Sequence, residues 1–204
     1  MHPVALAKAA TRFARAERAV ASLEAATTHD EAEAAWNDFL TASGVVFNVL
    51  EQGAKSSPQS IGWYSRVKGE RKSDPALSYL HQARNSETHG IESVTTRHQQ
   101  YDLPDGHPIF KITVDEGARI WNTTYQGPDG IRRSMHLDRK DGIRLAAVTN
   151  RGVVYHPPRV HMGQVLEEVF NPIPLARAAI AHLSRLLEEA KELATLSSDQ
   201  PPLA

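Results

Sequence analysis

The sequence contains no cysteine among its 204 residues. Disulfide bonds, thiolate catalysis and thiolate metal sites are therefore excluded, and the composition fits a reducing compartment. Long apolar runs are also missing, since nowhere do about 18 apolar residues follow one another as a membrane-spanning helix requires. Residues 1–20 carry charges throughout, which argues against a secretory signal. We expect a cytoplasmic protein without a membrane partner.

A charge excess of either sign is absent as well. The 23 Lys and Arg residues against 24 Asp and Glu residues give a net charge of −1. No overall field therefore attracts nucleic acid, and any such attraction must come from a local patch. The apolar share of 41% is ordinary, and the chain is long enough to bury a core. These properties predict one globular domain, or one domain with an insertion.

Two kinds of pattern divide the chain. Apolar residues recur at steps of three and four, typical of amphipathic helices, over 4–26, 28–52, 75–99 and 172–196. From residue 108 to 156, turn signals arrive at roughly ten-residue spacing between runs that alternate apolar and polar residues, as an antiparallel sheet requires. The fold class predicted is α+β, an up-and-down bundle of about four helices with a small antiparallel β-meander inserted before the last helix. The predicted parts are a helical bundle at 1–104 plus 168–197, an antiparallel β insertion at 105–165, and a flexible tail at 198–204.

The stretch LSYLHQARNSETHGI at 77–91 holds the candidate catalytic residues. Arg84 occupies a position on the apolar stripe that Leu77 begins, and His89 follows five residues later. A guanidinium is always charged and its donors match phosphate oxygens, whereas an imidazole can transfer a proton near neutral pH. An amide between them, Asn85, can orient a phosphate or the histidine. These three groups suffice to cleave RNA without a metal, because a 2′-hydroxyl that loses its proton attacks the adjacent phosphorus and the arginine stabilises the added charge.

The order of Arg84, Asn85, three further residues and His89 resembles the signature of the HEPN superfamily, small helical bundles of prokaryotic toxin, abortive-infection and RNA-processing systems. The resemblance implies a four-helix bundle with the motif on a late helix. It also implies a homodimer whose two motifs face each other, and a metal-independent endoribonuclease with Arg84 and His89 as the catalytic pair. Inactive family members serve as binding or dimer modules. The β insertion is not part of the family fold, and Ile91 stands where many members carry an aromatic residue.

Helix geometry bears on this pair. On a straight helix Arg84 and His89 point about 140° apart, so we expect a partner subunit to complete the site across a two-fold axis. His81, Asn85 and His89 share one helix face. Two histidines and an amide make a poor metal site, so we expect neither a metal nor another cofactor.

The stretch 54–73 is predicted to be a connector, because it contains a proline and two glycines. Its five basic residues against one acidic residue, with two aromatic residues between them, suit a phosphate backbone and stacked bases. The predicted nucleic-acid-binding residues are Trp63, Tyr64, Arg66, Lys68, Arg71 and Lys72. The alternative is a solvated loop whose aromatic residues pack on the core.

We therefore expect an RNA-cleaving or RNA-binding element of a defence, toxin or stress system. One alternative is a non-catalytic dimerisation or protein-interaction module, in which Arg84 is a buried structural cation. The other is a protein that binds a small molecule or peptide with its β insertion, in an apolar pocket bounded by Trp121 and Tyr125.

Overall fold

The computed structural model describes residues 1–89, 93–101, 109–113, 120–126 and 129–198. Within these ranges the chain forms five helices and eight strands, an α+β fold that confirms the predicted class. The helices are α1 (Pro3–Ala25), α2 (His29–Ala54), α3 (Pro58–Ser73), α4 (Pro75–His89) and α5 (Pro172–Ser198). The predicted tail lies outside the described residues, apart from Ser198 at the end of α5.

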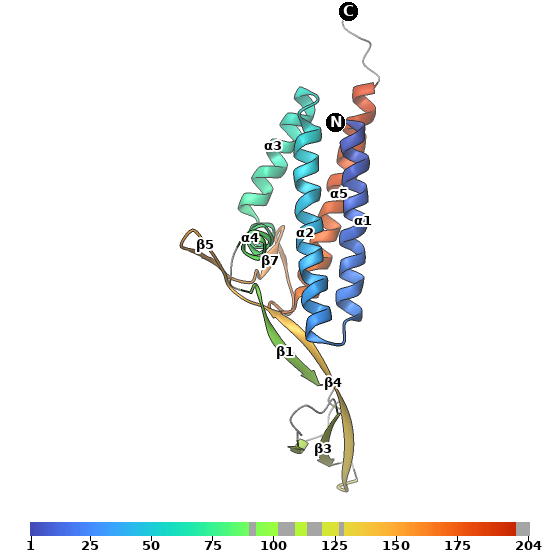
Figure 1. Cartoon of the computed structure of the whole chain (residues 1–204), viewed down its shortest axis with the longest axis vertical. Coiled ribbons are helices and arrows are strands. Elements are labelled where there is room, and N and C mark those ends of the chain that lie inside the picture. The colour runs from blue at the N-terminus through green and yellow to red at the C-terminus, as the bar shows by residue number, and fades with distance from the viewer. Residues whose placement is uncertain (90–92, 102–108, 114–119, 127–128, 199–204) are drawn as a thin grey trace, which may run out of the picture.

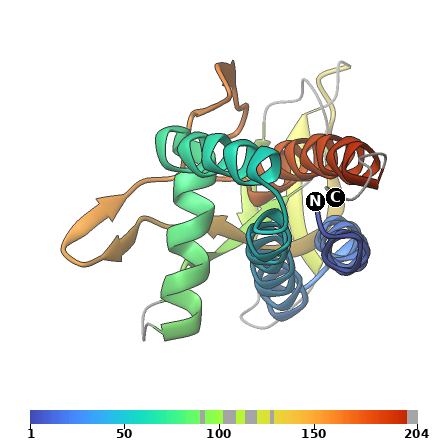
Figure 2. The same ribbon diagram turned by 90° about the horizontal axis from the view of Figure 1, so that it is seen from above.

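Helices α1, α2 and α5 run side by side, with α3 next to α2 (Figure 1). Helix α4 is seen down its axis in the same view, so it lies across the others (Figures 1 and 2). Trp36 and Phe39 of α2 are fully buried, with ring centroids 5.4 Å apart. Burying one such side chain contributes about 1.5–3 kcal/mol. Within the described ranges, no helix combines the length and the apolar character that crossing a membrane requires.

Local signals account for several helix starts. The Thr28 hydroxyl accepts a hydrogen bond from the Glu31 backbone N–H at 3.3 Å, and the Glu31 carboxylate accepts one from the Thr28 backbone N–H at 3.1 Å. This capping box begins α2. Asp74 caps α4 by accepting from the Leu77 backbone N–H at 2.9 Å, directly before Pro75.

The prediction of a connector at 54–73 is wrong, because most of this stretch is helix α3. Ser57 caps α3 by accepting from the Ser60 backbone N–H at 3.3 Å, and Pro58 takes the first helical position, where a proline is tolerated. Tyr64 and Val67 are buried one turn apart. Tertiary packing of these two residues therefore stabilises a helix whose apolar pattern is weak.

The prediction that the third helix runs to about Gln99 is also wrong. Helix α4 ends at His89, and the strand β1 (Thr95–Tyr101) follows. Val94 and Thr95 are buried, and β1 pairs antiparallel with β4 (Arg132–Leu145) from Thr95↔Leu145 to Tyr101↔Arg139. β-branched residues favour a strand here, where a distant segment completes the ladder.

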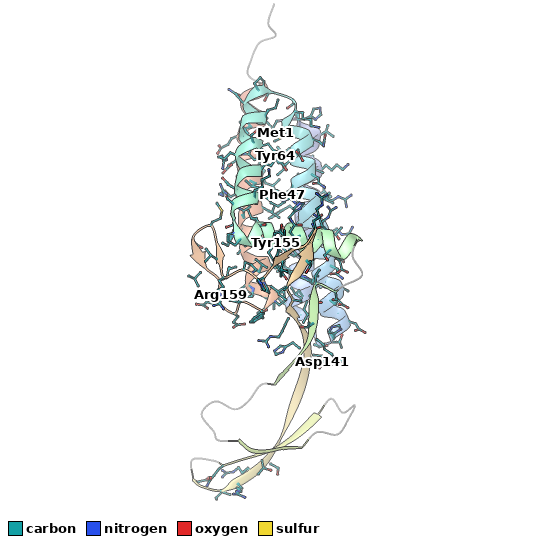
Figure 3. All side chains as sticks on the ribbon, turned by 90° about the vertical axis from the view of Figure 1, so that its left-hand side faces the viewer. Met1, Phe47, Tyr64, Asp141, Tyr155 and Arg159 are labelled. Carbon is teal, nitrogen blue, oxygen red and sulfur yellow. The ribbon has the colours of Figure 1, made fainter. Side chains whose placement is uncertain are left out.

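The remaining strands form an antiparallel ribbon and two small hairpins. Strand order in the four-stranded sheet is β1-β4-β3-β2, with β2 at Ile109–Thr113 and β3 at Ile120–Gln126. Strand β4, with 14 residues, is roughly 46 Å long at about 3.3 Å per residue, and it extends well beyond the helices (Figures 1 and 3). The hairpins pair β5 (Val148–Asn150) with β6 (Val153–Tyr155), and β7 (Val160–His161) with β8 (Gln164–Val165).

The β7–β8 hairpin is attached to the start of α4 through the buried Asp74. Its carboxylate accepts hydrogen bonds from the Met162 backbone N–H at 2.6 Å and from His161 Nδ1 at 3.0 Å. Burial would raise the pKa of Asp74, but the bonds from Met162, Leu77 and His161 outweigh it and the pKa is lowered. This contact joins the hairpin to the N-terminal end of α4.

Candidate functional site

Arg84 lies half-buried on α4 and faces α2. A Cβ atom added to Gly44 of α2 would lie 3.3 Å from both Cδ and Nε of Arg84, tighter than most real Cβ contacts. Gly44 therefore leaves room for the stem of the arginine, where a larger residue would press on it.

Four helices enclose a small cavity beside Arg84. It is lined by residues of α2, α3, α4 and α5, among them Arg71, His81 and Arg84, and none of the described residues that line it is acidic. Its volume is about 20 Å³, enough for one water molecule or one oxygen atom of an anion. Two positive side chains thus converge on a space that suits an oxygen.

Arg71 reaches the cavity from the C-terminal end of α3. Its guanidinium carbon lies 4.5 Å from the centre of the Phe47 ring, and its Nη2 lies 2.7 Å from His81 Nδ1. Burial lowers the pKa of Arg71, and the nearby Arg84 adds to this effect. A guanidinium has donors but no acceptor, so Nδ1 of His81 must accept this hydrogen bond and the proton of the ring sits on Nε2.

His81 is neutral at pH 7. Burial, and then the charges of Arg71 and Arg84, lower its pKa to about 4. The Asn85 amide lies 3.4 Å from His81 Nε2. Since Nε2 carries the proton, the Asn85 amide can accept from it only through its oxygen.

A polar groove adjoins the cavity. It has a volume of about 590 Å³ and lies between α4 and the β5–β6 hairpin; its lining includes His81, Gln82, Asn85, Asn150, Arg151 and Tyr155. His81 lines both the cavity and the groove. The hairpin turns at Arg151 and Gly152 with φ of 51° and 78°, the positive values that a tight two-residue turn uses. Asn150 Nδ2 donates to Gln82 Oε1 at 2.5 Å, which joins the hairpin to α4.

Of the six predicted nucleic-acid-binding residues, the structure brings Arg71 to the cavity that Arg84 lines. Trp63 Nε1 donates to Glu189 at 2.7 Å, and the buried Tyr64 hydroxyl donates to the Phe47 carbonyl at 2.9 Å. The other three residues lie elsewhere on α3: Arg66 pairs with Glu70 and Glu189, Lys68 pairs with Glu51, and Lys72 is exposed.

His89 is the last residue of α4, and its side chain lies outside the described side chains. The residue that the structure does place beside Arg84 is His81, which the sequence marked as a weak metal ligand. Its spacing of three residues from Arg84 on one helix was the available signal. Trp121 and Tyr125, the predicted walls of a sheet pocket, also have side chains outside the described ones.

The described residues contain no group of three or more His, Cys, Asp or Glu side chains that could hold a metal ion. Comparison of the chain with protein families, with curated proteins and with solved structures finds no match. The resemblance to the HEPN superfamily therefore rests on the motif at residues 84–89 and stays a prediction.

Proposed function

We propose that this protein binds the phosphate groups of RNA through Arg71 and Arg84, as a HEPN-like element that acts as a homodimer. The observation that carries the proposal is the convergence of two guanidiniums and a neutral histidine on a cavity without an acidic residue among its described lining residues. Two cations brought together repel, and a phosphate oxygen between them converts the repulsion into charge-assisted hydrogen bonds. RNA supplies such oxygens along its whole backbone.

The reaction that we propose is transesterification. A 2′-hydroxyl loses its proton to a base, its oxygen bonds to the adjacent phosphorus, and the bond from phosphorus to the 5′-oxygen breaks. That oxygen takes up a proton, leaving a 2′,3′-cyclic phosphate and a 5′-hydroxyl. Arg84 stabilises the charge that develops on phosphorus, His89 transfers the proton, and Asn85 orients the phosphate. The partner subunit supplies the second member of the pair, because Arg84 and His89 lie about 140° apart on one helix.

The test is incubation of the purified protein with single-stranded RNA in EDTA, followed by analysis of the product ends. We expect 2′,3′-cyclic phosphate ends, and loss of cleavage in both Arg84→Ala and His89→Ala. Arg177→Gln is the matched control, since Arg177 is an exposed arginine on α5 that pairs with Glu24 at 2.7 Å. Cleavage that persists in His89→Ala contradicts the catalytic assignment, and failure of the unmodified protein to bind RNA contradicts the whole proposal.

The close packing of Arg84 on Gly44 favours a second candidate, a non-catalytic interaction module in which Arg84 stabilises the seam between α2 and α4. In that case Arg84→Ala should lower the melting temperature much more than His89→Ala, and neither change should alter RNA binding. Thermal unfolding and RNA binding of the same two variants separate the candidates.

A further inference from the structure

We propose that the groove between α4 and the β5–β6 hairpin receives the base of an unpaired RNA nucleotide. This inference rests on the proposed function, because it assigns the phosphate next to that base to Arg71 and Arg84. The ligand class is thus a single-stranded segment of RNA, held by one base and one phosphate.

The volumes of the cavity and the groove support placing the phosphate at the cavity and the base in the groove. The cavity beside Arg84 has a volume of about 20 Å³ and admits a single oxygen atom, so the rest of a bound nucleotide must lie outside it. The groove, with about 590 Å³, falls in the range of roughly 300–1,000 Å³ that is typical of small-ligand sites. His81 lines both spaces, so a phosphate at one and a base in the other are neighbours.

The chemistry of the groove suits a base edge. Three amide side chains line it, those of Gln82, Asn85 and Asn150, and each carries both donors and an acceptor. Base edges present the same mixture of donors and acceptors. The hydrogen bond from Asn150 to Gln82 holds two of these amides in place before a ligand arrives.

Two further residues offer flat surfaces. Tyr155 is half-buried in the wall of the groove, at the level of α4 (Figure 3), and Arg151 is exposed at the tip of the hairpin. Aromatic rings and guanidinium planes both stack on bases that are not paired. The hairpin stands beside α4 and projects away from the bundle (Figure 2). A base must leave a duplex to enter between these elements, so the groove selects single strands.

The experiment compares two synthetic RNAs of equal length, one with bases and one abasic throughout, by fluorescence anisotropy in EDTA. To prevent cleavage, both carry 2′-O-methyl groups. We expect the unmodified protein to bind the base-bearing strand about tenfold more tightly, since one stacked base contributes roughly 1–3 kcal/mol. Gln82→Ala should reduce this preference several-fold and leave the abasic strand unaffected. Gln59→Ala, an exposed glutamine near the start of α3, is the matched control.

A second variant guards against an indirect effect of Gln82→Ala on the hairpin. Arg151→Asn keeps a residue type that tolerates positive φ and should also reduce the preference. Equal affinity for the two strands, or a preference that survives both variants, overturns the base site and leaves phosphate binding intact. Failure of both strands to bind overturns the proposed function itself.

Discussion

Helix α3 carries Arg66 and Arg71 five residues apart, and the two side chains meet opposite surroundings. Arg66 pairs with Glu70 and Glu189, and Arg185 of α5 pairs with the same two carboxylates at 3.1 and 2.8 Å. This ion-pair network therefore contains two cations and two anions. Arg71 instead meets His81 and Arg84, a cation cluster with no acidic residue among the described residues that line its cavity.

The two arginines differ in their surroundings, and we propose that Arg66 serves stability and Arg71 serves ligand binding. The ion-pair network is balanced and lies near the surface, with 46% of the Arg66 side chain exposed, so each pair contributes about 0–1 kcal/mol. The cation cluster is half-buried. Burial and then the charge of Arg84 lower the pKa of Arg71, although Tyr64 and Glu51 act in the opposite direction. Burial and then the charges of Arg71 and Arg84 lower the pKa of His81. A phosphate oxygen is the ligand that we propose for this cluster.

Among the tests of this comparison, acidification should give the largest effect, which is a fall in the free energy of unfolding. The pKa of His81 in the folded protein is about 4 against an ordinary value of 6.5. Between these two values the unfolded chain binds a proton that the folded protein does not, so the free energy of unfolding falls as the pH drops. One pKa unit corresponds to 1.36 kcal/mol, and partial exposure reduces the effect, so we expect a loss of at most about 3 kcal/mol from this residue.

Urea unfolding at pH 7 and pH 4.5 measures the loss. His81→Gln should lose clearly less stability over this interval than the unmodified protein, because glutamine keeps an acceptor for Arg71 and does not titrate. His156→Gln, a change at an exposed histidine, is the control and should leave the pH dependence unaltered. Identical pH dependence in all three proteins would mean that the cation cluster does not act on His81.

Local signals in the sequence predict those parts of the fold that depend on nearby residues. The capping box of α2 joins residues three apart in the sequence, and the start of α4 uses Asp74 directly before Pro75. Helix α3 and strand β1 were not predicted, because both depend on contacts with residues that are distant in the sequence. Helix α3 depends on burial of Tyr64 and Val67, and β1 depends on pairing with β4, whose partner residues lie 38 to 50 positions further along the chain.

The candidate site could also be predicted only where it depends on nearby residues. The sequence singled out Arg84 and Asn85 on chemical grounds, and it assigned Arg71 to nucleic acid without linking it to Arg84. That link depends on the break between α3 and α4 at Asp74, which is held by contacts with the distant Met162 and His161. No spacing along the chain contains this information.

A carboxylate introduced into the cavity should sharpen the comparison by adding a negative charge to the cation cluster. Ser43 of α2 is buried and lines the cavity, so Ser43→Asp places a negative charge where we expect a phosphate oxygen. RNA affinity should fall at least tenfold, or about 1.4 kcal/mol, while the melting temperature stays equal or rises. Ser43→Asn has nearly the same shape without the charge and should weaken RNA binding much less. Equal losses in the two variants would point to steric blocking instead of charge.

The ion-pair network should give the smallest effect. Glu70→Gln removes the charge that Arg66 and Arg185 share, and the free energy of unfolding should fall by no more than about 1 kcal/mol, less in 0.5 M salt. RNA affinity should stay unchanged, because the network lies outside the cavity and the groove. Thermal unfolding at two salt concentrations and RNA anisotropy measure both quantities, with Glu188→Gln as a control on an exposed carboxylate that pairs with Lys191. A large loss of RNA binding in Glu70→Gln would erase the distinction between the two regions, because it would show that Arg66 and Arg185 also serve the ligand.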